Sequence, residues 1–85
     1  MSDFNSFRFG FVGLGLIGGS IAKAIRSYWP MAEILAYNPS RDTLDEAIHD
    51  GVVNAGACSE DGPLDGALFE NCDIVFLCAP DQKNA

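Results

Sequence analysis

The chain has 85 residues, of which 48% are hydrophobic, and its 12 acidic and 5 basic residues give a formal net charge of −7. This size and composition indicate one small globular domain with a thin core and exclude a disordered chain. No Lys/Arg cluster is present to bind nucleic acid or an anionic membrane, no apolar run is long enough to span a membrane, and the N-terminus does not resemble a secretion signal.

Strands and helices alternate along the predicted chain, which is typical of a parallel sheet with right-handed crossovers. The first strand is nearly continuously apolar, as expected when both faces are buried. In the first helix an apolar stripe joins Ile17 to Tyr28, and Arg26 is expected to point away from it. In chain order, the prediction is a strand at 8–12, a helix at 16–28, a strand at 34–37, a helix at 39–50, a weak strand at 52–57, a short helix at 64–70 and a strand at 73–80.

This order predicts an α/β fold, a Rossmann-type doubly wound parallel sheet in three αβα layers. Only its N-terminal β-α-β-α-β-α-β portion is present, so residues 1–85 are expected to be a partial NAD(P)-binding domain without the remaining strands or a substrate domain. An intact 85-residue domain is the alternative. In the partial domain, the last strand would lie at a sheet edge without its fifth-strand partner, which predicts self-association.

The organising motif is Gly13-Leu14-Gly15-Leu16-Ile17-Gly18, which follows the first strand and opens the first helix. A dinucleotide-binding turn has this setting. Gly13 permits the tight turn, Gly15 lets a pyrophosphate approach the backbone, and Gly18 lets the helix pack on the sheet. Unpaired N–H groups at the helix start would attract the diphosphate. The alternative is that the glycines serve backbone geometry alone.

The end of the second strand bears on the choice of cofactor. Asn38 stands where an acid would bind the ribose hydroxyls of NAD, and it lacks the charge that repels a 2′-phosphate. Ser40 can donate to that phosphate and Arg41 can pair with it, which favours NADP over NAD. Alternatively, Asn38 and Ser40 are helix caps and Arg41 is solvated.

A third candidate contact is Cys78-Ala79-Pro80, where the last strand reaches the ligand-binding edge of the sheet. Pro80 alternatively only ends the strand. No catalytic residue is predicted, and His49 lies at the end of a helix away from that edge. Cys58, Cys72 and Cys78 fit no zinc spacing, so we expect reduced thiols, a cytoplasmic protein and no metal site.

The loop at 11–20, which continues Leu16-Ile17-Gly18-Gly19-Ser20, resembles the N-terminus of prephenate and arogenate dehydrogenases, and the strand at 73–80 resembles their fourth strand. The resemblance implies NAD(P)-dependent oxidative decarboxylation of prephenate or arogenate in tyrosine biosynthesis, by a cytoplasmic homodimer. The catalytic residues of that family would follow residue 85, so the 85 residues alone are expected to be inactive. The cofactor contacts it implies are Gly13, Gly15, Leu16, Ile17, Gly18, Asn38, Ser40, Arg41, Cys78, Ala79 and Pro80.

Two alternatives remain at this point. An Asn followed by Ser and Arg near the end of the second strand also resembles the 3-hydroxyacid dehydrogenase and pyrroline-carboxylate reductase group. The other alternative, from a different class, is a non-catalytic nucleotide-binding module.

Overall fold

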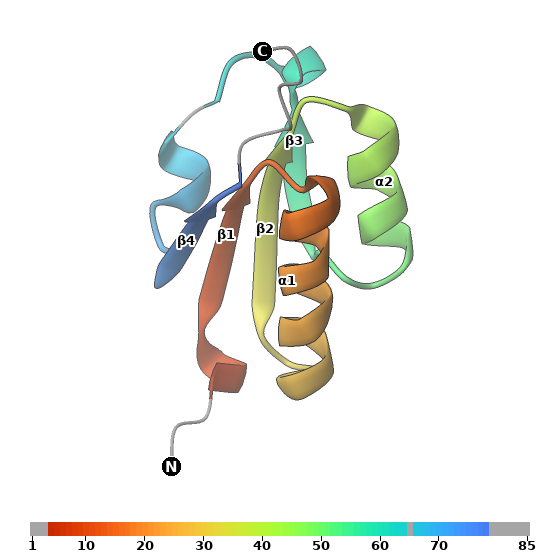
Figure 1. The fold of residues 1–85 in the computed structure, drawn as a ribbon. Coiled ribbons are helices and arrows are strands. Elements are labelled where there is room, and N and C mark those ends of the chain that lie inside the picture. The colour runs from red at the N-terminus through yellow and green to blue at the C-terminus, as the bar shows by residue number, and fades with distance from the viewer. Residues whose placement is uncertain (1–3, 65, 79–85) are drawn as a thin grey trace.

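A computed structural model describes residues 4–64 and 66–78 (Figure 1). Strands and helices alternate as the sequence predicted, with one short 3-10 turn before the first strand and two between the third and fourth strands. No helix in the described ranges is long and apolar enough to cross a membrane. The elements are η1 (Phe4–Ser6), β1 (Arg8–Val12), α1 (Gly15–Tyr28), β2 (Glu33–Asn38), α2 (Arg41–His49), β3 (Ala55–Cys58), η2 (Ser59–Asp61), η3 (Gly66–Phe69) and β4 (Ile74–Leu77).

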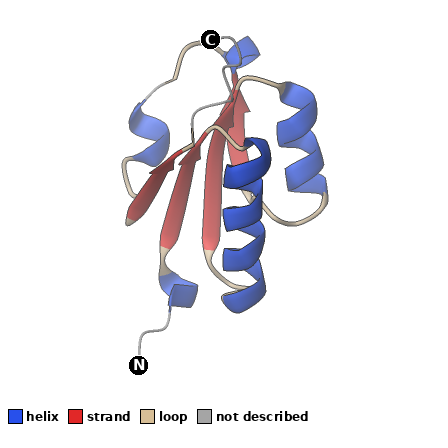
Figure 2. Cartoon of the chain, viewed as in Figure 1, coloured by secondary structure: helices blue, strands red, loops and turns tan. Residues whose placement is uncertain are grey.

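The four strands form one parallel sheet in the order β3-β2-β1-β4 (Figure 2). The chain runs outward from β1 through β2 to β3, then crosses back to place β4 on the other side of β1. Phe11 pairs with Ala36 on one side and with Phe76 on the other. This all-parallel sheet with helices between strands confirms the predicted Rossmann-like α/β fold.

One face of the sheet carries α1 and α2 (Figure 1). The opposite face is covered near Gly10, where an added Cβ would lie 2.5 Å from the Phe69 ring and 3.1 Å from the Cys72 sulfur. Three consecutive residues of β1, Phe9, Gly10 and Phe11, are buried, so the predicted burial of the first strand on both faces is confirmed, whereas the side chains of β2 alternate between buried and half-buried. The buried hydrophobic core comprises Phe9, Phe11, Leu14, Ala22, Ile25, Ala32, Ile34, Ala36, Leu44, Val53 and Cys58.

The predicted apolar stripe of α1 is wrong at both ends. Ile17 and Tyr28 are 73% and 75% exposed, whereas the buried residues of the helix are Gly18, Ala22 and Ile25. The helix sits close enough to the sheet to select small side chains for its inner face, and this rotates the larger ones outward.

Arg26 was expected to point into solvent and instead joins three segments at the far end of α1. Its guanidinium donates to the carbonyl oxygens of Pro30 (2.7 Å), Ala32 (2.6 Å) and Val52 (3.2 Å), and to Asn54 Oδ1 (2.7 Å). These bonds satisfy carbonyl oxygens of the segments before β2 and β3, which the helical pattern alone does not indicate.

The chain before β4 and the edge of the sheet also depart from expectation. A single 3-10 turn, η3, replaces the short helix predicted at 64–70, and none of its residues is buried. In β4, Leu77 is 81% exposed, and Ile74 and Val75 also face outward in part. The predicted self-association and homodimer stay predictions, as does the partial-domain boundary.

Candidate functional site

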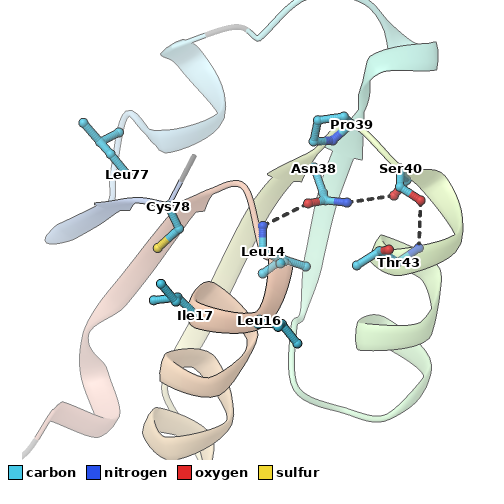
Figure 3. A pocket seen from close by; sticks show the side chains of 10 residues that line it. Leu14, Leu16, Ile17, Asn38, Pro39, Ser40, Thr43, Leu77 and Cys78 are labelled. Atoms are coloured by element: carbon cyan, nitrogen blue, oxygen red, sulfur yellow. Dashed lines mark hydrogen bonds between the residues drawn. The ribbon is translucent and has the colours of Figure 1, made fainter. Parts of the chain in front are cut away.

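A cavity of ≈ 730 Å³ opens at the carboxyl ends of the strands, where the chain switches from one side of β1 to the other (Figure 3). Ligands of open α/β sheets bind at such switch points. Three segments supply its walls: the start of α1, the end of β2 with the start of α2, and the end of β4. The lining residues are Leu14, Gly15, Leu16, Ile17, Asn38, Pro39, Ser40, Thr43, Leu77 and Cys78.

The glycine loop presents the start of α1 to this cavity. Leu14 occupies the N-cap position and has no side-chain oxygen, so the N-cap side chain does not cap the first-turn N–H groups. Gly15 has φ +53° and open space beyond its missing Cβ. An anion can therefore approach the positive end of the helix dipole along the backbone.

Gly18 does not line the cavity. A Cβ there would come within 2.7 Å of the Gly13 carbonyl oxygen and 3.2 Å of the Cys78 Cβ. This contact confirms the predicted role of Gly18 in close helix packing. Because Gly18 has no side chain, the start of α1 can lie close to the end of β4, and both border the same cavity.

Leu16 and Ile17 form an apolar rim, 90% and 73% exposed. Across the cavity, the end of β4 adds Leu77 and Cys78. Cys78 therefore lies where the sequence placed it, while the predicted contacts at Ala79 and Pro80 fall outside the described residues.

Asn38 ties the two main walls together and is only 6% exposed. Its Oδ1 accepts a hydrogen bond from the Leu14 backbone N–H at 2.9 Å, and its Nδ2 donates to the Ser40 carbonyl oxygen at 3.0 Å. Gly13 adds a parallel link, since its N–H donates to the Tyr37 carbonyl oxygen at 2.7 Å. The amide of Asn38 thus fixes the glycine loop relative to the start of α2, a role more specific than the predicted cap.

Ser40 is the N-cap of α2, and its Oγ accepts from the Thr43 N–H at 3.3 Å. Pro39 was predicted as the first helical residue, but it precedes the cap and lines the cavity. Thr43 also lines it. Two hydroxyls therefore border the cavity beside Asn38, where a ribose or a phosphate would be hydrogen-bonded.

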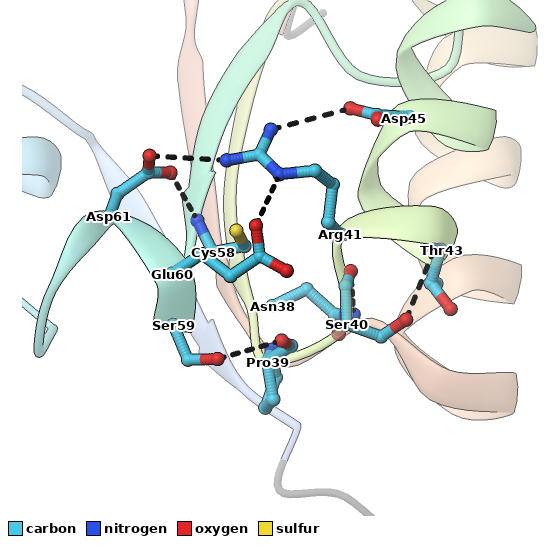
Figure 4. Close-up of polar contacts among 10 residues, drawn as sticks. All are labelled: Asn38, Pro39, Ser40, Arg41, Thr43, Asp45, Cys58, Ser59, Glu60 and Asp61. Atoms are coloured by element: carbon cyan, nitrogen blue, oxygen red, sulfur yellow. Dashed lines mark hydrogen bonds and ion pairs between the residues drawn. The ribbon is translucent and has the colours of Figure 1, made fainter.

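Arg41 does not line the cavity, although it directly follows Ser40. Its guanidinium is held by two acids of η2, Glu60 and Asp61, at 3.1 Å each, and lies 3.9 Å from Asp45 (Figure 4). The hydrogen bond to Glu60 is the main cause that raises the pKa of Arg41. The pKa of Asp61 is lowered, chiefly by the hydrogen bond that its carboxylate accepts from the Cys58 N–H.

Sequence reasoning missed four lining residues, Leu14, Pro39, Thr43 and Leu77. Thr43 carried a usable signal, since the third residue of a helix points its side chain toward the N-cap region. The described residues contain no group of three or more His, Cys, Asp or Glu side chains able to hold a metal ion. His49 is in the last turn of α2 and does not line this cavity.

No family model matches the chain. Two curated relatives are similar to it in sequence, and both are named "Cytokine-like nuclear factor N-PAC". The protein from Drosophila pseudoobscura pseudoobscura is 34% identical over 77 residues, and that from Drosophila melanogaster is 31% identical over 77 residues. Each alignment covers 91% of this chain and 11% of the relative, so the chain spans about a ninth of their length.

These relatives correct the resemblance to prephenate and arogenate dehydrogenases, and with it the assignment to tyrosine biosynthesis. Both are named nuclear factors. The Leu16-Ile17-Gly18-Gly19-Ser20 continuation failed as a family marker because those positions form the first turns of α1, and such a turn recurs in proteins of unrelated function. The predicted cytoplasmic location is corrected by the same names, and reduced thiols suit the nucleus as well as the cytoplasm.

Proposed function

We propose that the chain binds the adenosine and pyrophosphate portion of a nicotinamide dinucleotide, as the cofactor-binding part of an NAD(P)-dependent dehydrogenase. The observation that carries this proposal is the uncapped start of α1 facing a cavity at the switch point of the sheet. The first-turn N–H groups suit the pyrophosphate, and the apolar rim of Leu16 and Ile17 offers cover for a planar base.

We propose NADP as the preferred cofactor, with NAD as the alternative. Asn38 brings no negative charge to the ribose end of the cavity, and the hydroxyls of Ser40 and Thr43 lie beside it. An acid in place of Asn38 would repel a 2′-phosphate, whereas an amide tolerates both nucleotides.

Isothermal titration of the protein with NAD and NADP tests the binding proposal. Gly15→Ala should weaken both nucleotides by about 10-fold or more, because the methyl group would stand where the pyrophosphate approaches and because φ +53° strains an alanine. Gly19→Ala is the matched control, since a Cβ there meets nothing within 4 Å and Gly19 does not line the cavity. Equal affinity in both variants would refute the proposal.

For the reaction itself, the Asn-Ser-Arg pattern at 38–41 favours the 3-hydroxyacid dehydrogenase and pyrroline-carboxylate reductase group over the corrected assignment. Substrate binding and pairing with a second subunit would then be properties of the whole protein. The 85 residues alone should transfer no hydride, because the residues that line the cavity include no His, Asp, Glu, Lys or Tyr side chain for acid–base catalysis. Turnover of a 3-hydroxyacid by the isolated 85 residues would contradict this expectation.

A second candidate is a nucleotide-binding module without catalysis in a nuclear protein, which the names of the two relatives favour. Both candidates predict dinucleotide binding. They separate in a turnover assay of the full-length protein, where hydride transfer supports the dehydrogenase and binding without turnover supports the module.

A further inference from the structure

The cation expected to recognise a 2′-phosphate is already engaged by carboxylates. Arg41 Nε lies 3.1 Å from Glu60 Oε1, and Nη2 lies 3.1 Å from Asp61 Oδ1. Asp45, one turn further along α2, is 3.9 Å from Nη1. One positive and three negative charges leave this cluster with a net charge of −2.

A 2′-phosphate carries roughly −1.5 to −2 charges near neutral pH and binds best to a guanidinium whose donors are free. Facing the intact cluster, it meets net repulsion. It gains Arg41 only by displacing a carboxylate from it. The Arg41 side chain is 41% exposed and follows the cavity residue Ser40, so its long flexible stem can turn toward the ribose end.

We propose that Glu60 competes with the 2′-phosphate of NADP for the Arg41 guanidinium and thereby limits how strongly the site prefers NADP over NAD. Glu60 is thus a specificity-determining residue outside the cavity. This inference rests on the proposed function.

Glu60, and not Asp61, is the displaceable partner. Asp61 is anchored by its other carboxylate oxygen, Oδ2, which accepts from the Cys58 N–H at 2.9 Å. The Glu60 side chain is 70% exposed, and its polar contact in the described part of the chain is Arg41. Asp45 is too far from the guanidinium for a hydrogen bond. Exposed ion pairs are weak in water, so a phosphate can overcome this one.

Titration of the protein with NADP and with NAD at low ionic strength tests the competition. Glu60→Gln should raise NADP affinity about 3- to 10-fold and change NAD affinity less than about twofold. Glu70→Gln is the matched control, because it removes the same charge from an exposed turn outside the Arg41 cluster. Adding Arg41→Ala to Glu60→Gln should reduce the gain to less than about twofold, since the gain requires the released guanidinium.

The outcomes distinguish a failure of the Glu60 competition from a failure of dinucleotide binding. An unchanged NADP-to-NAD ratio in Glu60→Gln, an equal rise in Glu70→Gln, or a gain that survives Arg41→Ala overturns the competition while leaving dinucleotide binding intact. Failure of both nucleotides to bind the unsubstituted protein refutes the proposed function, and the competition with it.

Discussion

Asn38→Ala is the substitution with the largest expected effect on the geometry of the site. It removes the acceptor of the buried Leu14 N–H and the donor to the Ser40 carbonyl oxygen. An unpaired buried N–H costs about 1–3 kcal/mol and each lost hydrogen bond about 0.5–1.5 kcal/mol, so the free energy of unfolding should fall by about 2–4 kcal/mol. A domain of this length has roughly 4–13 kcal/mol in total.

Urea denaturation followed by circular dichroism measures this loss directly. In thermal unfolding, the midpoint temperature should fall by roughly 10–25 °C. Asn71→Ala, in the exposed turn after η3, is the matched control and should change the free energy of unfolding by less than about 0.5 kcal/mol. Nucleotide affinity should fall together with stability in Asn38→Ala, because the glycine loop loses its link to β2. A loss below about 0.5 kcal/mol would refute the claim that this amide joins the two walls of the cavity.

Three further predictions concern packing and charge. Gly18→Val should destabilise the fold by about 1–3 kcal/mol and weaken NAD binding, because a Cβ there would meet the Gly13 carbonyl oxygen. Gly19→Val should do neither, since a Cβ there meets nothing within 4 Å. Equal effects of the two substitutions in calorimetry and in NAD titration would contradict this. Arg26→Ala should lower the free energy of unfolding, measured by urea titration, by about 2–4 kcal/mol, because it removes the donors to four acceptors. Lys23→Ala, at an exposed position of the same helix, should change this free energy by less than about 0.5 kcal/mol. The lowered pKa of Asp61 stabilises the fold above its ordinary value of 3.8, and this contribution disappears as the pH falls through the lower folded-state pKa. The difference in melting temperature between the unsubstituted protein and Asp61→Asn should therefore shrink below pH 3.8, and a constant difference would count against it.

The alternation of strands and helices was readable from local pattern. The observed bounds of β1 are the predicted ones, and α1 ends shortly before Pro30, as predicted. The orientation of α1 was not readable, because Ile17 and Tyr28 satisfy a helical apolar period as well as Gly18 and Ala22 do. Which set faces the sheet depends on how closely the helix approaches it, and that distance is a tertiary property.

Family identity was the weakest inference from sequence. Gly18 is required by the close packing of the loop and helix, since a Cβ there would meet the Gly13 carbonyl oxygen, so it marks a type of turn and not a reaction. The two relatives, named nuclear factors, overturned the assignment drawn from that loop.

By itself, the sequence determined the order of strands and helices, the parallel sheet and the position of Gly13, Gly15 and Gly18 after the carboxyl end of the first strand, because periodicity and glycine conformation are local. Only the tertiary structure decided the partners of Asn38 and Arg41. Asn38 meets a loop 24 residues away, and Arg41 meets acids 19 and 20 residues away. Long polar side chains take their partners from whatever the fold brings near them, so the charge available to a ligand is fixed only once the chain has folded.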